Sequence, residues 1–340
     1  MSRRKSTSDK TKIEDVAAAA GVSIMTVSRA LRGVEGVSEQ RRQEIIEIAR
    51  RMRYVPNSNA RSLVGEQSAL IGVSLPTLFN DVFADILEGM RGAFDAAGFA
   101  TVVNTTEYQR ERERDWVNRV LTWRPSAMVL TGTDHDPSVV EMLRESRVPT
   151  LEVWDFSKEP VDICVGVDHE KAGYQVASSI RTRGYQRPAF VGFARGHDPR
   201  AERRLAGIQR AFGGDNGVEV RVARPEADSP YQIGYEGLKQ LWRDGSDKPD
   251  IVFFLSDQLA FGGLMACEEL GIEVPEQVGL VGFNGLSITS VLPKKLTTVI
   301  TPRRRMGTLG ASCLIARING VRSDLSSELN TEVVMGDTTR

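Results

Sequence analysis

Residues 13–31 of this 340-residue chain read Ile-Glu-Asp-Val-Ala-Ala-Ala-Ala-Gly-Val-Ser-Ile-Met-Thr-Val-Ser-Arg-Ala-Leu, and they predict two short helices joined by a turn. An alanine-rich helix is expected over residues 15–20, with Thr11 and Glu14 forming a capping box at its start. Gly21 then interrupts the helical pattern, because glycine readily adopts the left-handed conformation that ends a helix.

A second helix is expected over residues 24–32. Ser23 is a favourable N-cap for it, and Gly33 is a favourable stop. Ser38 is expected to cap a third helix that runs towards Met52. Two short helices joined by a tight glycine-containing turn and supported by a third helix form an all-α helix-turn-helix unit.

The residue types on the second helix indicate how such a unit would meet DNA, because the N-terminal part of that helix enters the major groove. Ile24 and Met25 are expected to face base edges, since Val22 and Val27 already supply the face that packs on the core; ordinary core packing is the alternative. Arg29, about one turn further along, has the donors to bind a guanine. Short hydroxyl groups suited to phosphate oxygens lie at Ser23, Thr26 and Ser28.

The charge distribution indicates a polyanion as the partner of this region. Residues 1–66 contain 13 Lys or Arg against 8 Asp or Glu, whereas the remaining residues contain 31 against 37. A small basic region on a larger acidic body is typical of a protein whose small part meets nucleic acid, with a solvated charged face as the alternative.

Composition and motifs exclude several classes of protein. No apolar run of about 18 residues occurs, and the N-terminus has no signal-like apolar segment, so we expect a cytoplasmic protein. The three cysteines lie far apart and suit neither a disulfide framework nor a zinc site, and neither metal nor cofactor is predicted. Phosphate-loop, metalloprotease and nucleophile-elbow motifs are absent, so no enzyme activity is expected. The isolated histidines are expected to be solvated or capping residues; they are His135, His169 and His197.

The rest of the chain alternates short apolar strands with helical segments. Continuous apolar strands with intervening helices are typical of parallel sheets covered on both faces, and nine or more strands are too many for one ordinary sheet. We therefore expect an α/β body of two doubly wound subdomains, with helices that include residues 83–97 and 174–183. The expected strands lie at 70–75, 100–103, 127–130, 150–153, 163–167, 189–191, 218–220, 251–255 and 278–283.

Polar residues near the ends of these strands are the candidates for a ligand site, because ligands bind beyond the carboxyl ends of parallel strands. The guanidinium of Arg204 matches a carboxylate or a pair of hydroxyls, with a surface arginine as the alternative. Asp257 is equally suited to capping the helix that follows it. The candidate ligand-binding residues are Asn80, Phe83, Thr133, Asp155, Arg203, Arg204, Asp257 and Asn284.

Four segments carry a resemblance to a known family: Ile13-Glu-Asp-Val-Ala, Ala20-Gly-Val-Ser, Thr26-Val-Ser-Arg-Ala-Leu and Tyr54-Val-Pro-Asn57. In order and spacing they resemble the head of the LacI/GalR transcription repressors, and Ala60-Arg61-Ser62-Leu63 resembles the hinge helix of that family. The resemblance implies a DNA-binding head over residues 1–66 with a hinge helix at 57–64. It further implies that Asn57, Ala60 and Leu63 of this hinge contact DNA, with Leu63 wedged between base pairs.

The resemblance also implies a periplasmic-binding-protein-like body over residues 68–340, which binds an effector and dimerises. Its first subdomain is expected to comprise about 68–162 and 294–322, and its second about 163–293 and 323–340. No leucine heptad follows the body, so we expect a homodimer and not a tetramer.

Several residues favour a sugar acid as the effector. Relatives that bind sugars or purines commonly have Asp where this chain has Asn284, and a neutral amide does not repel an anion. Residues 301–307 and 75–84 resemble the gluconate-utilisation repressors of the family. We expect a repressor that gluconate or a ketogluconate releases from pseudo-palindromic operator DNA. A corepressor-dependent or dual regulator is the alternative, and a soluble sugar-binding receptor or sugar-processing enzyme is a remote one.

Overall fold

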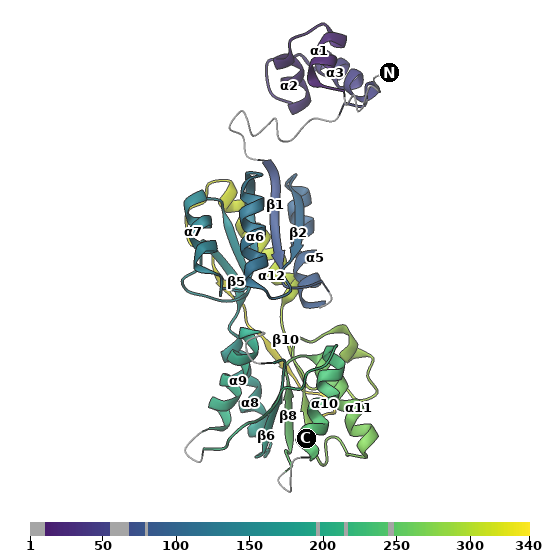
Figure 1. Ribbon diagram of the computed structural model, residues 1–340, viewed down its shortest axis with the longest axis vertical. Helices are drawn as coiled ribbons and strands as arrows, with labels where there is room; N and C mark the ends of the chain where they lie inside the picture. The colour runs from purple at the N-terminus through teal and green to yellow at the C-terminus, as the bar shows by residue number, and fades with distance from the viewer. Residues whose placement is uncertain (1–10, 55–67, 79–80, 195–197, 214–216, 244–247) are drawn as a thin grey trace, which may run out of the picture. The chain divides into compact units, whose positions relative to one another are not determined.

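The computed structural model describes residues 11–54, 68–78, 81–194, 198–213, 217–243 and 248–340 (Figure 1). The chain divides into two compact units, residues 1–68 and 69–340, called here the head unit and the body unit. The predicted hinge at 57–64, with its DNA contacts Asn57, Ala60 and Leu63, lies outside the described residues, as does Asn80. No helix in the described part of the chain is long and apolar enough to cross a membrane.

The head unit has three helices within residues 11–54: α1 (Ile13–Ala20), α2 (Ile24–Arg32) and α3 (Glu39–Arg51). Gly21 and Gly33 end α1 and α2 with φ angles of 63° and 69°, the left-handed conformation that glycine adopts without strain. The three helices enclose a small apolar core of Val16, Ala17, Ala20, Val27, Ala30, Ile45 and Ala49. The predicted helix-turn-helix unit is therefore confirmed.

The start of α1 differs from the prediction. The carboxylate of Asp15 accepts a hydrogen bond from the backbone N–H of Lys12 at 2.7 Å, so the helix begins at Ile13. The hydroxyl of Thr11 instead donates to the carbonyl of Met52 at 2.9 Å. The predicted capping box of Thr11 and Glu14 is wrong, because a contact with the end of α3 takes the threonine hydroxyl.

The first subdomain of the body unit is built on a six-stranded sheet in the order β11-β5-β4-β3-β1-β2. Two apolar clusters lie on its two faces, one shared with α5 and α12 and the other with α6 and α7. The strands are β1 (Ser68–Leu75), β2 (Ala100–Thr105), β3 (Pro125–Thr131), β4 (Thr150–Asp155), β5 (Ile163–Val167) and β11 (Ser327–Glu328). The helices are α5 (Asp81–Ala96), α6 (Arg110–Leu121), α7 (Pro137–Ser146) and α12 (Arg303–Ile318).

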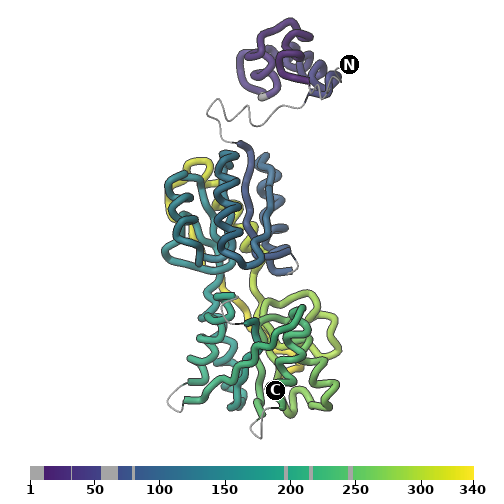
Figure 2. Tube along the Cα trace, viewed as in Figure 1, coloured from purple at the N-terminus to yellow at the C-terminus, as the bar shows by residue number. Residues whose placement is uncertain are grey.

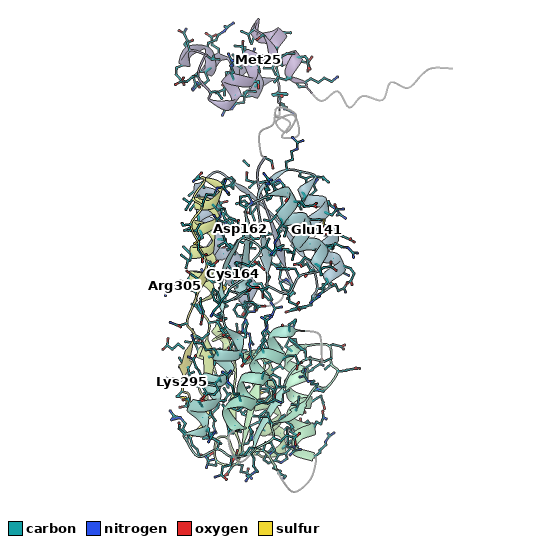
Figure 3. The ribbon with its side chains drawn as sticks, turned by 90° about the vertical axis from the view of Figure 1, so that its left-hand side faces the viewer. Met25, Glu141, Asp162, Cys164, Lys295 and Arg305 are labelled. Carbon is teal, nitrogen blue, oxygen red and sulfur yellow. The ribbon has the colours of Figure 1, made fainter. Side chains whose placement is uncertain are left out.

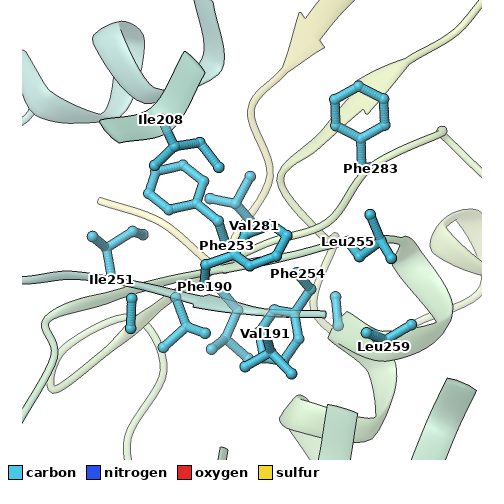
Figure 4. Packing of buried hydrophobic residues seen from close by; sticks show 14 of the residues in the cluster. Phe190, Val191, Ile208, Ile251, Phe253, Phe254, Leu255, Leu259, Val281 and Phe283 are labelled. Carbon is cyan, nitrogen blue, oxygen red and sulfur yellow. The ribbon is translucent and has the colours of Figure 1, made fainter. Parts of the chain in front are cut away.

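The second subdomain is built on a four-stranded parallel sheet in the order β7-β6-β8-β9. Its strands are β6 (Pro188–Val191), β7 (Arg221–Ala223), β8 (Ile251–Phe254) and β9 (Gly279–Val281), with α8 (His169–Arg181), α9 (Pro199–Phe212), α10 (Pro230–Arg243) and α11 (Asp257–Leu270) packed around them. Aromatic and branched side chains of the sheet and α9 fill the core (Figure 4). A short helix, η1 (Ser287–Ser290), and the antiparallel pair β10 (Thr298–Ile300) and β12 (Glu332–Val334) complete the body unit.

The boundary between the subdomains differs from the prediction. β5 pairs with β4, and β11 pairs with β5, so residues 163–167 and 327–328 belong to the first sheet and not to the second. Thr297 bridges to Val281 of β9, so the segment that leads into β10 lies with the second subdomain. The strand expected at 218–220 lies instead at β7, where pairing with β6 sets its position. Short apolar strands carry no local signal of the sheet that they join.

Three helix pairs of the body unit pack closely through glycines. A Cβ atom placed on Gly207 of α9 would lie 2.1 Å from the carbonyl oxygen of Glu170 in α8, and one on Gly173 of α8 would lie 2.3 Å from the carbonyl oxygen of Arg204 in α9. Only glycine allows the two backbones to approach so closely. The pair α10–α11 crosses in the same way at Gly234 and Gly262, and the pair α5–α12 at Gly89 and Gly307.

Candidate DNA-contacting helix and ligand cleft

The N-terminal end of α2 presents apolar side chains to solvent. Ile24 is 46% exposed, and Met25, which is labelled in Figure 3, is 62% exposed. Val27 is fully buried, and Val22 is partly buried against the core. Ordinary core packing is therefore wrong for Ile24 and Met25. Arg29 is exposed as well, so the helix carries apolar contacts and a guanidinium on its accessible surface.

The hydroxyl groups of α2 are organised by its N-cap. Ser23 Oγ accepts a hydrogen bond from the backbone N–H of Thr26 at 3.1 Å, and the two hydroxyl oxygens lie 2.9 Å apart. This cap satisfies a free N–H group of the first turn and fixes the direction in which the helix starts. Ser28 is half-buried on the same helix.

The body unit has a cavity of about 390 Å³ that residues of both subdomains line, called here the ligand cavity. Phe83 of α5 and Trp154 of β4 contribute its aromatic wall, with their rings 6.2 Å apart in a T-shaped contact. The other lining residues are Thr77, Val82, Glu107, Tyr108, Phe193, Asp198, Arg204, Ser229, Pro230, Tyr231, Leu255, Ser256, Gln258 and Asn284. An apolar cavity with a few convergent polar groups is the usual form of a small-molecule site.

Arg204 is a buried arginine in the wall of the ligand cavity. Its Nη1 donates to the carbonyl of Leu255 at 2.7 Å, and its Nε donates to Nδ1 of His169 at 3.2 Å. The guanidinium also stacks over the ring of Phe283, 3.7 Å from the centroid. These contacts hold the side chain in one orientation and occupy two of its nitrogen atoms.

His169 is buried and neutral. Burial and the neighbouring Arg204 lower the pKa of His169 to about 4. Since its Nδ1 accepts from Arg204, the proton lies on Nε2, which is 3.0 Å from a carboxylate oxygen of Asp155. The prediction that this histidine is solvated is wrong, because its position at the start of α8 is covered by the cleft residues.

Asp155 anchors the basic side chains of α9. Its carboxylate lies 3.4 Å from Nη1 of Arg203 and 4.0 Å from Nε of Arg200, in addition to its contact with His169. Burial opposes its ionisation, but Arg200 and His169 hold the pKa of Asp155 well below its usual range. The structure thus places Asp155 in the cleft as a partner of these arginines. Thr133 is half-buried and does not line the ligand cavity.

Asn284 places an amide in the ligand cavity from the segment that follows β9. The residue is 3% exposed, and its Oδ1 has no hydrogen-bond partner among the described residues. The backbone φ angle is 104°, a left-handed conformation that Asn tolerates better than most residues. Its carbonyl accepts hydrogen bonds from Arg303 Nη1 and, at 3.3 Å, from Thr301 Oγ1. An acceptor atom is therefore held rigidly at the cavity wall.

Asp257 has a different place from the one predicted. It is fully buried, and its carboxylate accepts from the backbone N–H of Leu286 at 2.6 Å and the hydroxyl of Thr298 at 2.5 Å. Burial raises the pKa of Asp257 to about 6. It does not line the ligand cavity; it ties α11 to the segments around η1 and β10. Ser256, the preceding residue, caps α11 and lines the cavity.

A second cavity of about 310 Å³, called here the side cavity, adjoins Tyr108, which also lines the ligand cavity. Arg200 lines the side cavity and was not among the predicted residues. It lies four residues before Arg204, and residues four apart share one face of a helix. That spacing is the signal in the sequence that indicates its place in the cleft.

His135 at the side cavity is also buried, contrary to the prediction. Its Nδ1 lies 2.8 Å from Glu113 Oε2, and its Nε2 lies 3.4 Å from Glu152 Oε1. Although burial opposes the charged form, the two glutamates raise the pKa of His135 to about 10. Within the described residues, no group of three or more His, Cys, Asp or Glu is arranged to hold a metal ion. Cys164 is a free, buried cysteine of the first subdomain (Figure 3).

Comparison with known proteins agrees with both units. Residues 12–57 match the family described as bacterial regulatory proteins, lacI family, and residues 177–339 match the periplasmic binding protein-like domain. The HTH-type transcriptional regulator GntR of Escherichia coli (strain K12) is 35% identical over 308 residues, which cover 91% of this chain and 92% of that protein. The chain belongs to the LacI family.

Other relatives of this LacI-family regulator match over most of its length. The HTH-type transcriptional regulator IdnR of Escherichia coli (strain K12) is 31% identical, with 96% of this chain and 98% of that protein covered. The crystal structure of a LacI-family transcriptional regulator from Silicibacter pomeroyi is 33% identical, with a TM-score of 0.89 over 97% of this chain and 100% of that one. The chain is therefore a DNA-binding transcription regulator with the fold that its sequence predicts.

The chain passes between the two subdomains of the body unit three times within the described residues (Figure 2). The first passage follows β5, the second lies between β9 and α12, and the third joins β11 to β12. Asn284 bridges to Ile300, the last residue of β10 before the chain enters α12, so this ligand-cavity residue lies beside a connection between the subdomains.

Proposed function

We propose that this regulator is a homodimeric repressor whose effector is a sugar acid such as gluconate or a ketogluconate. Operator DNA is contacted by Ile24, Met25 and Arg29 of α2, with phosphates bound by Ser23, Thr26 and Ser28. The exposed apolar end of α2 supports this assignment, because such side chains gain favourable contacts with thymine methyl groups in the major groove. The protein acts in the cytoplasm as a regulator and not as an enzyme.

The excess positive charge of the α9 arginines beside the ligand cavity is the observation that supports an acid as the effector. Among the described residues, Arg200 and Arg203 form ion pairs with the carboxylates of Asp155 and Asp198, Arg204 forms none, and His169 is neutral. One positive charge is left without a counter-charge in this cluster. A buried, uncompensated cation favours an anionic ligand, because burying a charge without a partner is costly.

The polar and aromatic groups of the ligand cavity suit the rest of a sugar acid. Asn284 offers an acceptor to hydroxyl groups, and Phe83 and Trp154 offer apolar surface to the carbon chain. Release of DNA requires that the effector bind more tightly to the conformation that cannot bind the operator, since equal affinity for both would shift nothing.

Two measurements on the full chain test this function. Calorimetry with gluconate, 2-ketogluconate, 5-ketogluconate, idonate and neutral sugars is expected to detect binding of an acid; binding of neutral sugars alone contradicts the choice of effector. Fluorescence anisotropy with an operator selected from random duplexes is expected to show weaker DNA binding when the acid is added. Stronger binding of the operator in the presence of the acid identifies the acid as a corepressor. Chemical conversion of the acid by the purified protein contradicts the proposal that the protein has no enzyme activity.

A further inference from the structure

Arg200 has a donor nitrogen for which the described protein atoms provide no acceptor. The residue is 5% exposed, and its Nε donates to Asp198 Oδ1 at 2.7 Å. Its Nη1 is buried and has no hydrogen-bond partner. The nitrogen lies where the side cavity opens beside Gly132, since a Cβ on that glycine would be 3.5 Å from it. An unsatisfied buried donor is uncommon, so an acceptor from a ligand is expected there.

The acidic groups that line the side cavity already have cationic partners. Asp134 pairs with Arg110 at 2.5 Å, and Glu113 pairs with the protonated His135 at 2.8 Å. Asp155 pairs with Arg203 at 3.4 Å and lies 4.0 Å from Arg200. These pairs reduce the repulsion that a ligand carboxylate would otherwise meet in this cavity.

Arg203 and Arg204, the two arginines predicted from the sequence, are less suited than Arg200 to binding a ligand carboxylate. Arg204 uses Nε and Nη1 within the protein, on His169 and the carbonyl of Leu255. Arg203 directs Nη1 to Asp155, and its side chain is 38% exposed, so its charge is partly screened by water. Of the three, Arg200 combines near-complete burial with a nitrogen that lacks a partner and lines a cavity.

The two cavities are placed to hold the two ends of one small molecule. Tyr108 lines both cavities, so they adjoin along one side chain. Arg200 and Arg204 lie four residues apart on α9, at positions about one helical turn from each other. The unpartnered groups are complementary to an acid with hydroxyls: a donor at Arg200 and an acceptor at Asn284 Oδ1.

We propose that Arg200 binds the carboxylate of the effector in the side cavity, while the hydroxyl-bearing chain lies in the ligand cavity against Asn284. This assignment rests on the proposed function. It identifies Arg200 as the residue by which the protein distinguishes an acid from a neutral polyol. Nη1 of Arg200 donates to a carboxylate oxygen, and Oδ1 of Asn284 accepts from a hydroxyl. A polyol of the same length leaves Nη1 of Arg200 without a charged acceptor.

The test compares gluconate with glucitol, which has the same six-carbon chain and a CH₂OH group in place of the carboxylate. Calorimetry on the full wild-type chain is expected to show at least a tenfold preference for gluconate. Arg200→Gln is expected to weaken gluconate binding by about 10- to 100-fold, the range for a hydrogen bond to a charged group. Glucitol binding is expected to change less than threefold, so the preference is lost.

Two further variants protect this comparison. Arg210→Gln removes an arginine from the same helix whose side chain is 55% exposed and pairs with Glu170, and it is expected to bind both ligands as the wild type does. If Arg200→Gln does not fold, as judged by circular dichroism, the double variant Asp198→Asn/Arg200→Gln removes both charges of the 2.7 Å pair together. The same loss of preference is expected from it.

The outcomes separate this assignment from the proposed function. A folded Arg200→Gln chain that keeps the wild-type preference for gluconate overturns the role of Arg200 and leaves the sugar-acid effector in place. If Arg203→Gln loses the preference for gluconate over glucitol and Arg200→Gln keeps it, the role of Arg200 is likewise overturned and the sugar-acid effector stays in place. Wild-type protein that binds neither gluconate nor glucitol overturns the proposed effector class and this assignment with it.

Discussion

Replacing Gly207 by alanine tests whether the close approach of α8 and α9 positions the ligand cleft. The new Cβ would lie 2.1 Å from the carbonyl oxygen of Glu170 and 2.6 Å from the backbone nitrogen of Tyr174, whereas ordinary contacts begin at 3.4 Å. Because backbone atoms cannot rotate away as a side chain does, the helices must separate by about 1 Å. Overpacking of this kind costs about 1–3 kcal/mol, and the better helix propensity of alanine returns about 1 kcal/mol. We expect a net loss of about 1 kcal/mol in the free energy of unfolding.

The same separation is expected to weaken effector binding. His169 begins α8 and Arg204 lies in α9, so moving the helices apart lengthens the 3.2 Å hydrogen bond between them. Urea unfolding followed by circular dichroism measures the stability, and calorimetry measures the effector affinity of the folded variant.

Gly92→Ala is the matched control for Gly207→Ala. Gly92 lies in α5, is exposed, and would meet nothing within 4 Å if it carried a Cβ. Alanine there is expected to raise the stability by about 0.5–1 kcal/mol and to leave effector binding unchanged. A Gly207→Ala chain as stable as the wild type would contradict the expected clash between α8 and α9, because the helices would then have separated without loss of packing.

Three further predictions concern other parts of the chain. Arg29→Ala should weaken specific operator binding by about 1–3 kcal/mol in fluorescence anisotropy, with little effect on random DNA, whereas the exposed Arg50 should tolerate the same change. The pKa of His135 is raised from 6.5 to about 10, so the protonated side chain stabilises the folded chain. This stabilisation is complete below pH 6.5 and is lost as the pH rises through 10. Urea unfolding should therefore show a decline of about 3 kcal/mol between pH 7 and pH 10 that His135→Gln lacks; equal pH profiles would contradict it. Asn284→Asp should place a carboxylate in the ligand cavity and lower gluconate affinity at least tenfold in calorimetry, and an unchanged affinity would remove the argument from the neutral amide.

The head unit shows how far local pattern alone can predict structure. Ser23 and Gly33 bound the second helix as expected, and the spacing of apolar residues correctly separates the buried Val27 from the exposed Met25. Such features depend on interactions within one or two turns of a helix, and the sequence records those directly. The cap of α1 was predicted wrongly because Thr11 contacts Met52, which is 41 residues away.

In the body unit, the sequence determined the alternation of strands and helices, since apolar runs and amphipathic helices follow from burial on one or both faces. It also placed Arg204 and Asn284 in the ligand cavity. Three features required the tertiary structure: β5 joins the first sheet, the carboxylate of Asp257 binds Leu286 and Thr298, and Arg200 has a nitrogen without a partner among the described residues. The reason is physical: whether a polar atom is available to a ligand depends on which partners reach it. Those partners come from distant segments, such as Leu255, which lies 51 residues from the Arg204 that it binds.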